Sequence, residues 1–297
     1  MRQGDLVVRK SYNGDIVFRI QQLTQQKALL KGTDFRLLAD SPLTDLSALS
    51  ESSRNRYEEE MRVKVAESVR RMEQFRRGQV DRNRALLKQE LRNTHPYFEV
   101  PGKVLHLDGD QSYMHKSMDL YKELGVPAQG FYVPESQMAD TLQRLLPQLR
   151  PDIVVLTGHD GLVRTRNAEG ARNLSSYKNS HHFVNAVNVA RQYERNRDAL
   201  VIFAGACQSH FEALLMAGAN FASSPRRVLI HALDPLYIAS KVALTPIKET
   251  VHIVDVIHHT MSGLDGLGGI ETRGSYRIGL PSLQAGEASY PQANSLT

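Results

Sequence analysis

The sequence contains a single cysteine, Cys207, among 297 residues. One cysteine cannot form an internal disulfide, and it excludes a zinc site built from several cysteines. The sequence also lacks any run of about eighteen uncharged apolar residues, the length of a membrane helix. Its first ten residues, MRQGDLVVRK, carry charges without the apolar stretch of a secretory signal. These absences predict a cytoplasmic protein with no membrane partner.

The composition is that of a globular protein with its charge concentrated at one end. Hydrophobic residues make up 41% and charged residues 23%, enough apolar material for a sizeable core. The formal net charge is +5. Residues 1–100 hold 19 Lys and Arg against 14 Asp and Glu, whereas the remainder is balanced. A basic face attracts nucleic acid or an acidic protein, although a solvated helix face gives the same pattern.

Residues 1–45 are expected to form a small β-module in the style of an SH3-like barrel. Short β-prone runs occur at 6–8, 15–20 and 27–31, and Asn13-Gly14 between the first two tolerates the positive φ of a tight turn. Such modules bind protein or RNA, and the fold alone does not decide which.

Residues 46–97 are expected to form a basic helical linker. Apolar residues three or four positions apart share one helix face, which we interpret as a packing surface: Tyr57, Met61, Val65, Val69 and Met72. Between residues 61 and 92, ten basic residues accompany four acidic ones. Gly78 is expected to divide the stretch into two helices, because glycine costs about 1 kcal/mol inside a helix. His95-Pro96 is expected to end it.

Residues 98–297 are expected to form a doubly wound α/β domain with a mostly parallel sheet. Continuous apolar runs at 104–107, 131–133, 153–156, 200–204 and 228–231 are typical of strands buried on both faces. They alternate with helical stretches, and Val228–His231 is the expected fifth strand. The last dozen residues are expected to be loose. In such a sheet the functional groups lie at the carboxyl ends of the strands.

That rule selects a short set of candidate residues: Asp108, Asp110, His159, Asp160, Cys207 and Asp234. A cysteine becomes a nucleophile as its thiolate, which a helix N-terminus or a nearby histidine favours. Cys207 lies where an apolar strand turns into a helix, and Gly205 allows a tight approach there. If strands 153–156 and 200–204 are neighbours, His159 and Cys207 meet at one edge. A buried cysteine or a structural histidine is the ordinary interpretation of each residue alone, but the pair favours catalysis.

The motifs Thr-Gly-His-Asp-Gly (157–161) and Ala-Gly-Ala-Cys-Gln-Ser (204–209) resemble those of the caspase–clostripain–gingipain clan of cysteine peptidases. That clan places a histidine after one strand and Ala-Cys after the next, with the histidine about fifty residues upstream. Together with the β-module and the basic helix, nearly the whole chain resembles a family of sporulation-specific peptidases from spore-forming bacteria. The resemblance implies a caspase-like fold. We expect no cofactor and no metal. The resemblance further implies processing of spore coat and cortex-associated proteins near arginine, in the mother-cell cytoplasm or at the spore coat.

The resemblance also implies a role for each residue. Cys207 attacks the scissile carbonyl, His159 protonates the leaving amine, and the backbone N–H groups of Cys207 and Asp160 bind the oxyanion. The clan usually has glycine directly after the histidine, whereas here Asp160 intervenes. An arginine substrate needs a carboxylate. Asp108 and Asp110 are the leading candidates, with Asp160 and Asp234 behind them, although Asp-Gly after a strand is also ordinary turn chemistry.

Two rival functions fit parts of the sequence. The segment 205–209 also resembles the nucleophile turn of glutamine amidotransferase-like proteins, in which His231 or His252 would serve as the base. Alternatively, the β-module and basic helix hold RNA or protein and the α/β domain is a scaffold. The second rival gives no role to the pairing of His159 with Cys207, so nucleic acid is not the expected partner.

The remaining motifs carry weaker interpretations. Asp108-Gly109-Asp110 resembles part of a magnesium-dependent phosphatase, but the other phosphate-binding elements are missing. The histidine pairs 181–182 and 258–259 point about 100° apart on a helix and are not expected to share a metal ion. Outside the amidotransferase rival, we interpret Tyr113, His115, His210 and His252 as structural or surface residues. The sequence leaves open whether the chain forms a homo-oligomer.

Overall fold

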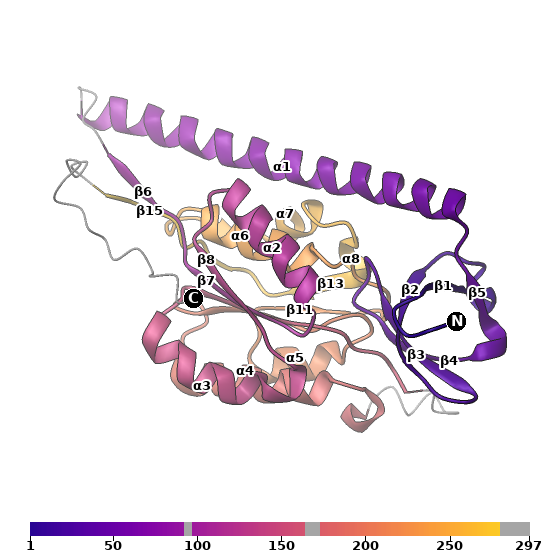
Figure 1. Ribbon diagram of the computed structural model, residues 1–297. Helices are drawn as coiled ribbons and strands as arrows, with labels where there is room; N and C mark the ends of the chain where they lie inside the picture. Colours follow the sequence, from indigo (N-terminus) through magenta and orange to yellow (C-terminus); the bar gives the residue numbers. More distant parts are fainter. Residues whose placement is uncertain (92–96, 164–172, 280–297) are drawn as a thin grey trace.

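The computed structural model describes residues 1–91, 97–163 and 173–279. An N-terminal antiparallel sheet is followed by one long helix and then by an α/β domain (Figure 1). The expected ends of the helical segment at His95-Pro96 and of the chain at its last dozen residues lie outside the described residues. No helix in the described part of the chain has the length and apolar character needed to cross a membrane.

The N-terminal sheet confirms the β-structure expected for residues 1–45. Its five antiparallel strands lie in the order β4-β3-β2-β1-β5. Their bounds are Leu6–Arg9 (β1), Val17–Leu23 (β2), Lys27–Gly32 (β3), Leu38–Pro42 (β4) and Leu46–Ala48 (β5). Asn13 and Gly14 take the expected positive φ values of 52° and 77°. The loop is longer than a tight hairpin, because a short 3-10 helix, Lys10–Tyr12, precedes them.

Helix α1 runs without interruption from Glu51 to Leu91, so the expected division at Gly78 is wrong. The expected apolar stripe explains why: Met72 is fully buried, and Val65 and Val69 pack against the core. Packing of an amphipathic face supplies most of a helix's stability in a protein, which outweighs the cost of one glycine.

Substitution of Gly78 by alanine is expected to stabilise the protein. Gly78 is exposed, and an added Cβ would meet no atom within 4 Å. Alanine should raise the free energy of unfolding by up to about 1 kcal/mol, because it restricts the unfolded chain. Urea unfolding measures the effect. Gly218→Ala is the matched control, since Gly218 ends a helix at φ +114° and should lose stability instead. A less stable Gly78→Ala variant would contradict the prediction.

The α/β domain has a six-stranded sheet in the order β13-β11-β10-β9-β7-β8. Strands β7 to β11 are parallel, and β13 is antiparallel to its neighbour. The bounds are Val104–Asp108 (β7), Ala128–Tyr132 (β8), Ile153–Thr157 (β9), Val201–Ala204 (β10), Phe221–Ser223 (β11) and Leu267–Gly269 (β13). This confirms the mixed α/β class and the mostly parallel sheet. Two smaller ladders pair β6 (Phe98–Val100) with β15 (Arg277–Gly279) and β12 (Thr250–Val251) with β14 (Thr272–Arg273).

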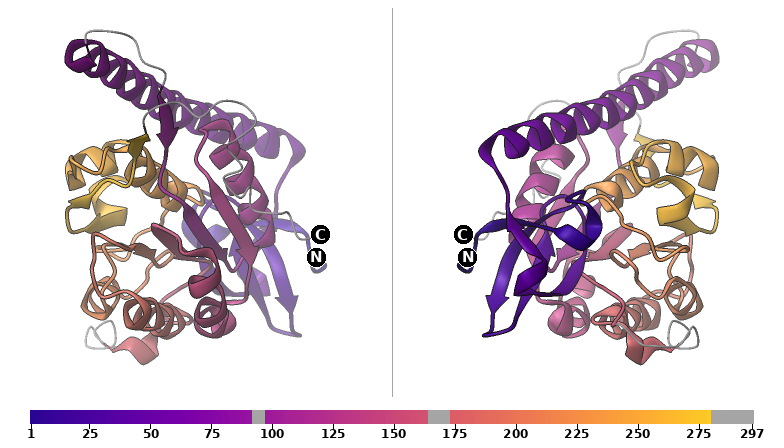
Figure 2. Two further views of the ribbon diagram at one scale, coloured as in Figure 1. Left: turned by 90° about the vertical axis from the view of Figure 1, so that its left-hand side faces the viewer. Right: turned by 90° about the vertical axis from the view of Figure 1, so that its right-hand side faces the viewer.

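Helices cover both faces of this sheet (Figures 1 and 2). Helices α2 (Gln111–Glu123) and α6 (Asp234–Leu244) lie on one face, with α7 (Ile253–His258) and α8 (Gly263–Gly266) nearby. Helices α3 (Met138–Leu149), α4 (Ser180–Tyr193) and α5 (Phe211–Ala217) lie on the other. One hydrophobic cluster is continuous from the N-terminal sheet to the first face and includes Phe18, Leu30, Phe203 and Leu236. The N-terminal sheet therefore shares its core with the α/β domain.

The expected fifth strand at Val228–His231 is wrong. Strand β11 takes that place in the sheet. The segment 228–231 instead runs beside a loop of the N-terminal sheet, where His231 forms a β-bridge with Phe35. The apolar run has β propensity, but its partner is a distant part of the chain, which local pattern does not reveal.

Candidate active site

The carboxyl ends of three neighbouring strands meet at one edge of the sheet. Strand β9 lies between β10 and β7, and Asp108 is opposite Thr157 in the register. His159 follows β9 by two residues and Cys207 follows β10 by three, so both belong to this edge. The Thr157 hydroxyl donates to the carbonyl of Gly205 at 2.9 Å and ties the two loops together.

Cys207 is fully buried in the turn between β10 and α5. The backbone N–H of Ile230 donates to its Sγ atom at 3.2 Å. Burial raises the pKa of Cys207 to about 12, although hydrogen bonding with the backbones of Ile230 and Arg36 opposes the rise. The thiol is therefore protonated in this arrangement.

His159 is fully buried, and its ring stacks on Tyr113 at a centroid distance of 5.4 Å. Neither ring nitrogen has a hydrogen-bond partner among the described residues. Burial and the positive charge of Lys31 lower its pKa, so the imidazole is neutral and can accept a proton. The backbone N–H of His159 donates to the half-buried Glu135 carboxylate at 2.9 Å, which holds the loop in place.

Asp160 directly follows His159 in the loop after β9. Its carboxylate is buried and accepts hydrogen bonds from Ser180, from Ser209 at 2.8 Å and from the backbone of Asn179 at 2.8 Å. Its side chain thus joins the loop after β9 to the turn after Cys207. The backbone N–H of Asp160 does not take part in these contacts. It donates to the carbonyl oxygen of Arg36 at 3.2 Å.

The backbone of Arg36 lies in the middle of the site. Its carbonyl oxygen accepts from two N–H groups, those of Asp160 at 3.2 Å and Cys207 at 3.1 Å. Its own N–H donates to the Ile230 carbonyl at 3.2 Å. The loop between β3 and β4 therefore runs through the edge of the sheet where Cys207 and His159 lie.

The side chain of Arg36 forms a buried ion pair with Asp108. Two parallel hydrogen bonds of 3.0 and 2.9 Å join its Nη atoms to the two carboxylate oxygens, and both side chains are fully buried. Its Nε atom donates to the Ala232 carbonyl at 2.9 Å. Burial alone would raise the pKa of Asp108, but Arg36 and His106 outweigh it and hold that pKa below its ordinary value. This is the planar, bidentate recognition that selects a guanidinium.

The other candidate carboxylates do not form this contact. Asp110 caps helix α2 by accepting from the backbone N–H of Ser112 at 2.9 Å, and it lies 3.8 Å from Lys31 and 3.9 Å from His159. Asp234 is buried and accepts from the Met261 backbone at 2.8 Å. The Asp160 carboxylate accepts from Ser180, Ser209 and Asn179 instead.

The two alternative histidines lie in different settings. His231 is buried, accepts from the Leu233 backbone at 3.2 Å and contacts the Phe35 ring edge-on. His252 is exposed and pairs with Glu271 at 2.8 Å. Among the described residues, no three His, Cys, Asp or Glu side chains are grouped so that they could hold a metal ion.

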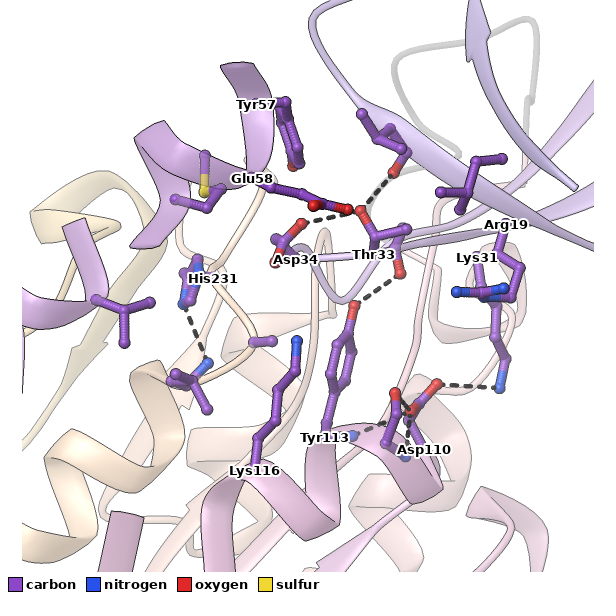
Figure 3. Close-up of a pocket in the computed structure, with 18 of the residues that line it drawn as sticks. Arg19, Lys31, Thr33, Asp34, Tyr57, Glu58, Asp110, Tyr113, Lys116 and His231 are labelled. Carbon is purple, nitrogen blue, oxygen red and sulfur yellow. Dashed lines mark hydrogen bonds and ion pairs between the residues drawn. The ribbon is translucent and has the colours of Figure 1, made fainter. Parts of the chain in front are cut away.

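A cavity of about 840 Å³ lies beside the site, between the N-terminal sheet, the start of α1 and helix α2 (Figure 3). Thr33, Asp34, Asp110, Tyr113 and His231 border it (Figure 3). The segment that leads into Arg36 thus forms part of the cavity wall.

Sequence reasoning missed three residues of the site. In the sequence Arg36 is one of several basic residues of a segment that is expected to form a separate module. Tyr113 is buried and donates to the Gly32 carbonyl at 2.7 Å, which agrees with a structural residue, but the sequence does not indicate that its ring stacks on His159. Glu135 carried no motif. The one available signal is the position of Tyr113, three residues after the Asp108-Gly109-Asp110 segment that ends the strand.

The sequence of the chain is similar to those of known peptidases. Residues 2–281 match the family described as YabG peptidase U57. The chain is also 43% identical over 283 residues to the sporulation-specific protease YabG of Bacillus subtilis (strain 168). That alignment covers 94% of this chain and 97% of the relative. The chain therefore belongs to the YabG peptidase family.

Proposed function

We propose that this chain is a cysteine endopeptidase of sporulating cells that cuts protein substrates after arginine. Cys207 is the nucleophile and His159 carries the proton. The observation that carries the proposal is the convergence of two backbone N–H groups, from Cys207 and Asp160, on one carbonyl oxygen. That is the arrangement of an oxyanion hole, and it is built around the turn that holds the thiol.

The mechanism follows from the two protonation states. The thiol is protonated, so it must lose its proton as Sγ attacks the carbonyl carbon. The neutral imidazole of His159 has a free nitrogen that accepts this proton. The negative oxygen of the intermediate is bound by the two N–H groups. His159 then gives the proton to the leaving amine, and water hydrolyses the thioester. No group beyond this pair, the two N–H donors and water enters the proposed steps.

Arginine preference is supported by the ion pair at Asp108. The pocket beside the proposed oxyanion hole already holds a guanidinium on two charge-assisted hydrogen bonds and a backbone carbonyl. Lysine would offer a point charge without the planar fork. The pocket therefore fits arginine as the residue that precedes the cut bond.

The wider biological assignment is part of the same proposal. A caspase-like arrangement agrees with a histidine after β9 and a cysteine after its parallel neighbour β10. Action on spore coat and cortex-associated proteins in the mother cell follows from the resemblance alone, whereas the name of the relative in Bacillus subtilis supports a role in sporulation. Several arginines of α1 pair with glutamates on the same helix, such as Arg54 with Glu58 at 2.7 Å, which favours a solvated face over an RNA-binding one.

Substitution of His159 by alanine is expected to lower kcat on an arginyl peptide by about 10²- to 10⁴-fold, the contribution of a positioned general acid–base. His252→Ala is the matched control, because His252 is exposed and paired with Glu271. It should keep activity within about twofold of the parent. A peptide-hydrolysis assay with both variants distinguishes the peptidase from the amidotransferase rival. Full activity of His159→Ala, or loss in His252→Ala, would exclude the proposed pair.

A further inference from the structure

The loop between β3 and β4 lies in the proposed site as a substrate would. Arg36 presents its carbonyl to the two N–H groups and its side chain to Asp108. We propose, on the basis of the function above, that the bond between Arg36 and Leu37 is a self-cleavage site. The uncut chain is then its own first substrate, and it blocks its site until that bond is cut.

The backbone contacts extend to both sides of this bond. Before it, the Arg36 N–H donates to Ile230 at 3.2 Å and the Asp34 carbonyl accepts from Ala232 at 2.8 Å. These two hydrogen bonds align the segment antiparallel to 230–232, the mode in which an extended peptide adds to a strand edge. After it, the Leu38 N–H donates to the Asp160 carbonyl at 2.9 Å. The carbonyl between them is the one in the proposed oxyanion hole, so the register selects Arg36–Leu37.

The side-chain contacts of Arg36 also support the bond between Arg36 and Leu37 as the cleavage site. It is fully buried, bonds Asp108 through both Nη atoms and lies over the Tyr113 ring at 5.0 Å. A structural arginine could occupy Asp108 with its backbone elsewhere. Here the backbone carbonyl of the same residue also accepts from the N–H of Cys207 at 3.1 Å. A side chain bound to Asp108 and a backbone carbonyl bound by the Cys207 N–H are both expected of a residue that precedes the bond to be cut.

The segment also closes the site. Cys207 and His159 are both fully buried, and the guanidinium pocket and the two N–H groups are occupied. No second peptide can use these groups while Arg36 holds them. Activity on other proteins therefore requires the segment to leave.

The cleavage step balances with water as its co-reactant. The Cys207 Sγ–C bond to Arg36 forms while His159 takes the thiol proton, and the Arg36–Leu37 C–N bond then breaks as His159 protonates the Leu37 nitrogen. Water hydrolyses the thioester, so its oxygen ends in the new Arg36 carboxylate and the thiol regains a proton. The products are residues 1–36 and residues 37–297.

After cleavage, the new C-terminus at Arg36 has room to leave the proposed site. Strands β1 to β3 remain paired with β4 and β5 after the cut, so the sheet holds the fragments together. Only the stretch from Thr33 to Arg36 has to move. Thr33 and Asp34 already border the cavity of about 840 Å³, which gives this stretch room (Figure 3).

The test follows purified full-length protein by intact mass spectrometry and by sequencing of new N-termini. Wild type should give a fragment that begins at Leu37, at a rate independent of protein concentration over a tenfold range. Hydrolysis of an arginyl peptide should rise in step with that fragment. Cys207→Ala should stay intact. A cut at another bond, or a rate proportional to concentration, would overturn self-cleavage at Arg36.

Two further variants test the register. Arg36→Gln should slow appearance of the Leu37 fragment by about a hundredfold or more, because the guanidinium contacts are lost. Arg19→Gln is the control, since Arg19 is exposed on β2 of the same sheet and its side chain bonds the Gly4 carbonyl. This variant should cleave at the parental rate. If Arg36→Gln fails to fold, the N-terminus of the fragment formed by wild type still shows whether the bond between Arg36 and Leu37 is cut. Cys207-dependent hydrolysis of the peptide by a chain that stays intact would overturn this inference alone, whereas absence of both reactions would overturn the proposed function as well.

Discussion

Cys207→Ala is expected to abolish hydrolysis of an arginyl peptide, with a fall in kcat of about 10⁴-fold or more, as for removal of a covalent nucleophile. The physical reason is that no other thiol exists in the chain and that the proposed oxyanion hole is built from the Cys207 backbone, which alanine retains. Steady-state hydrolysis of matched peptides measures the effect. The fold should persist, because the change removes one small buried atom at a cost of about 1 kcal/mol.

Alkylation provides an independent control for the same residue. Iodoacetamide should inactivate wild type, and mass spectrometry should locate the label on Cys207. Because the thiol is fully buried and its pKa is raised to about 12, the closed chain should react slowly. Undiminished hydrolysis by Cys207→Ala would remove this residue from the mechanism.

Asp108→Asn is expected to lower kcat/KM on arginyl peptides by about thirtyfold or more, while hydrolysis of a leucyl peptide changes little. Loss of the carboxylate removes both charge-assisted hydrogen bonds that the pocket offers a guanidinium. Asp110→Asn is the matched control, because Asp110 caps α2 and does not contact the Arg36 side chain. Its ratio of arginyl to leucyl hydrolysis should stay within about fivefold of the parent.

The ratio between peptides is the correct readout for Asp108. In the uncut chain the same substitution leaves the buried Arg36 unpaired, which destabilises the fold by about 3–5 kcal/mol. Fewer molecules are then active, but the ratio measured within one preparation does not depend on their number. An Asp108→Asn enzyme with its full preference for arginine would place the pocket elsewhere.

Local sequence pattern predicted the secondary structure correctly where a single pattern, either a buried apolar run or a helical period, was present. Buried apolar runs located β7, β9 and β10, because strands covered on both faces leave no polar positions. The period of Val65, Val69 and Met72 predicted the packed face of α1. Where rules competed, local pattern failed. One glycine did not break α1, and the β-prone run at Val228 joined no sheet, because in both cases distant packing outweighed the local preference.

By itself the sequence determined that one thiol and one histidine follow two successive buried strands, 48 residues apart, and it thereby pointed to the edge of the sheet that holds the site. It could not determine that β9 and β10 are neighbours, which depends on strand order. Nor could it single out Arg36, which lies 72 residues before Asp108 and 171 before Cys207. That placement arises only when the N-terminal sheet packs on the α/β domain through their shared core and carries the loop between β3 and β4 into the site. Hydrogen bonds between segments so far apart have no local period or motif, so the tertiary structure alone decided which arginine meets Asp108.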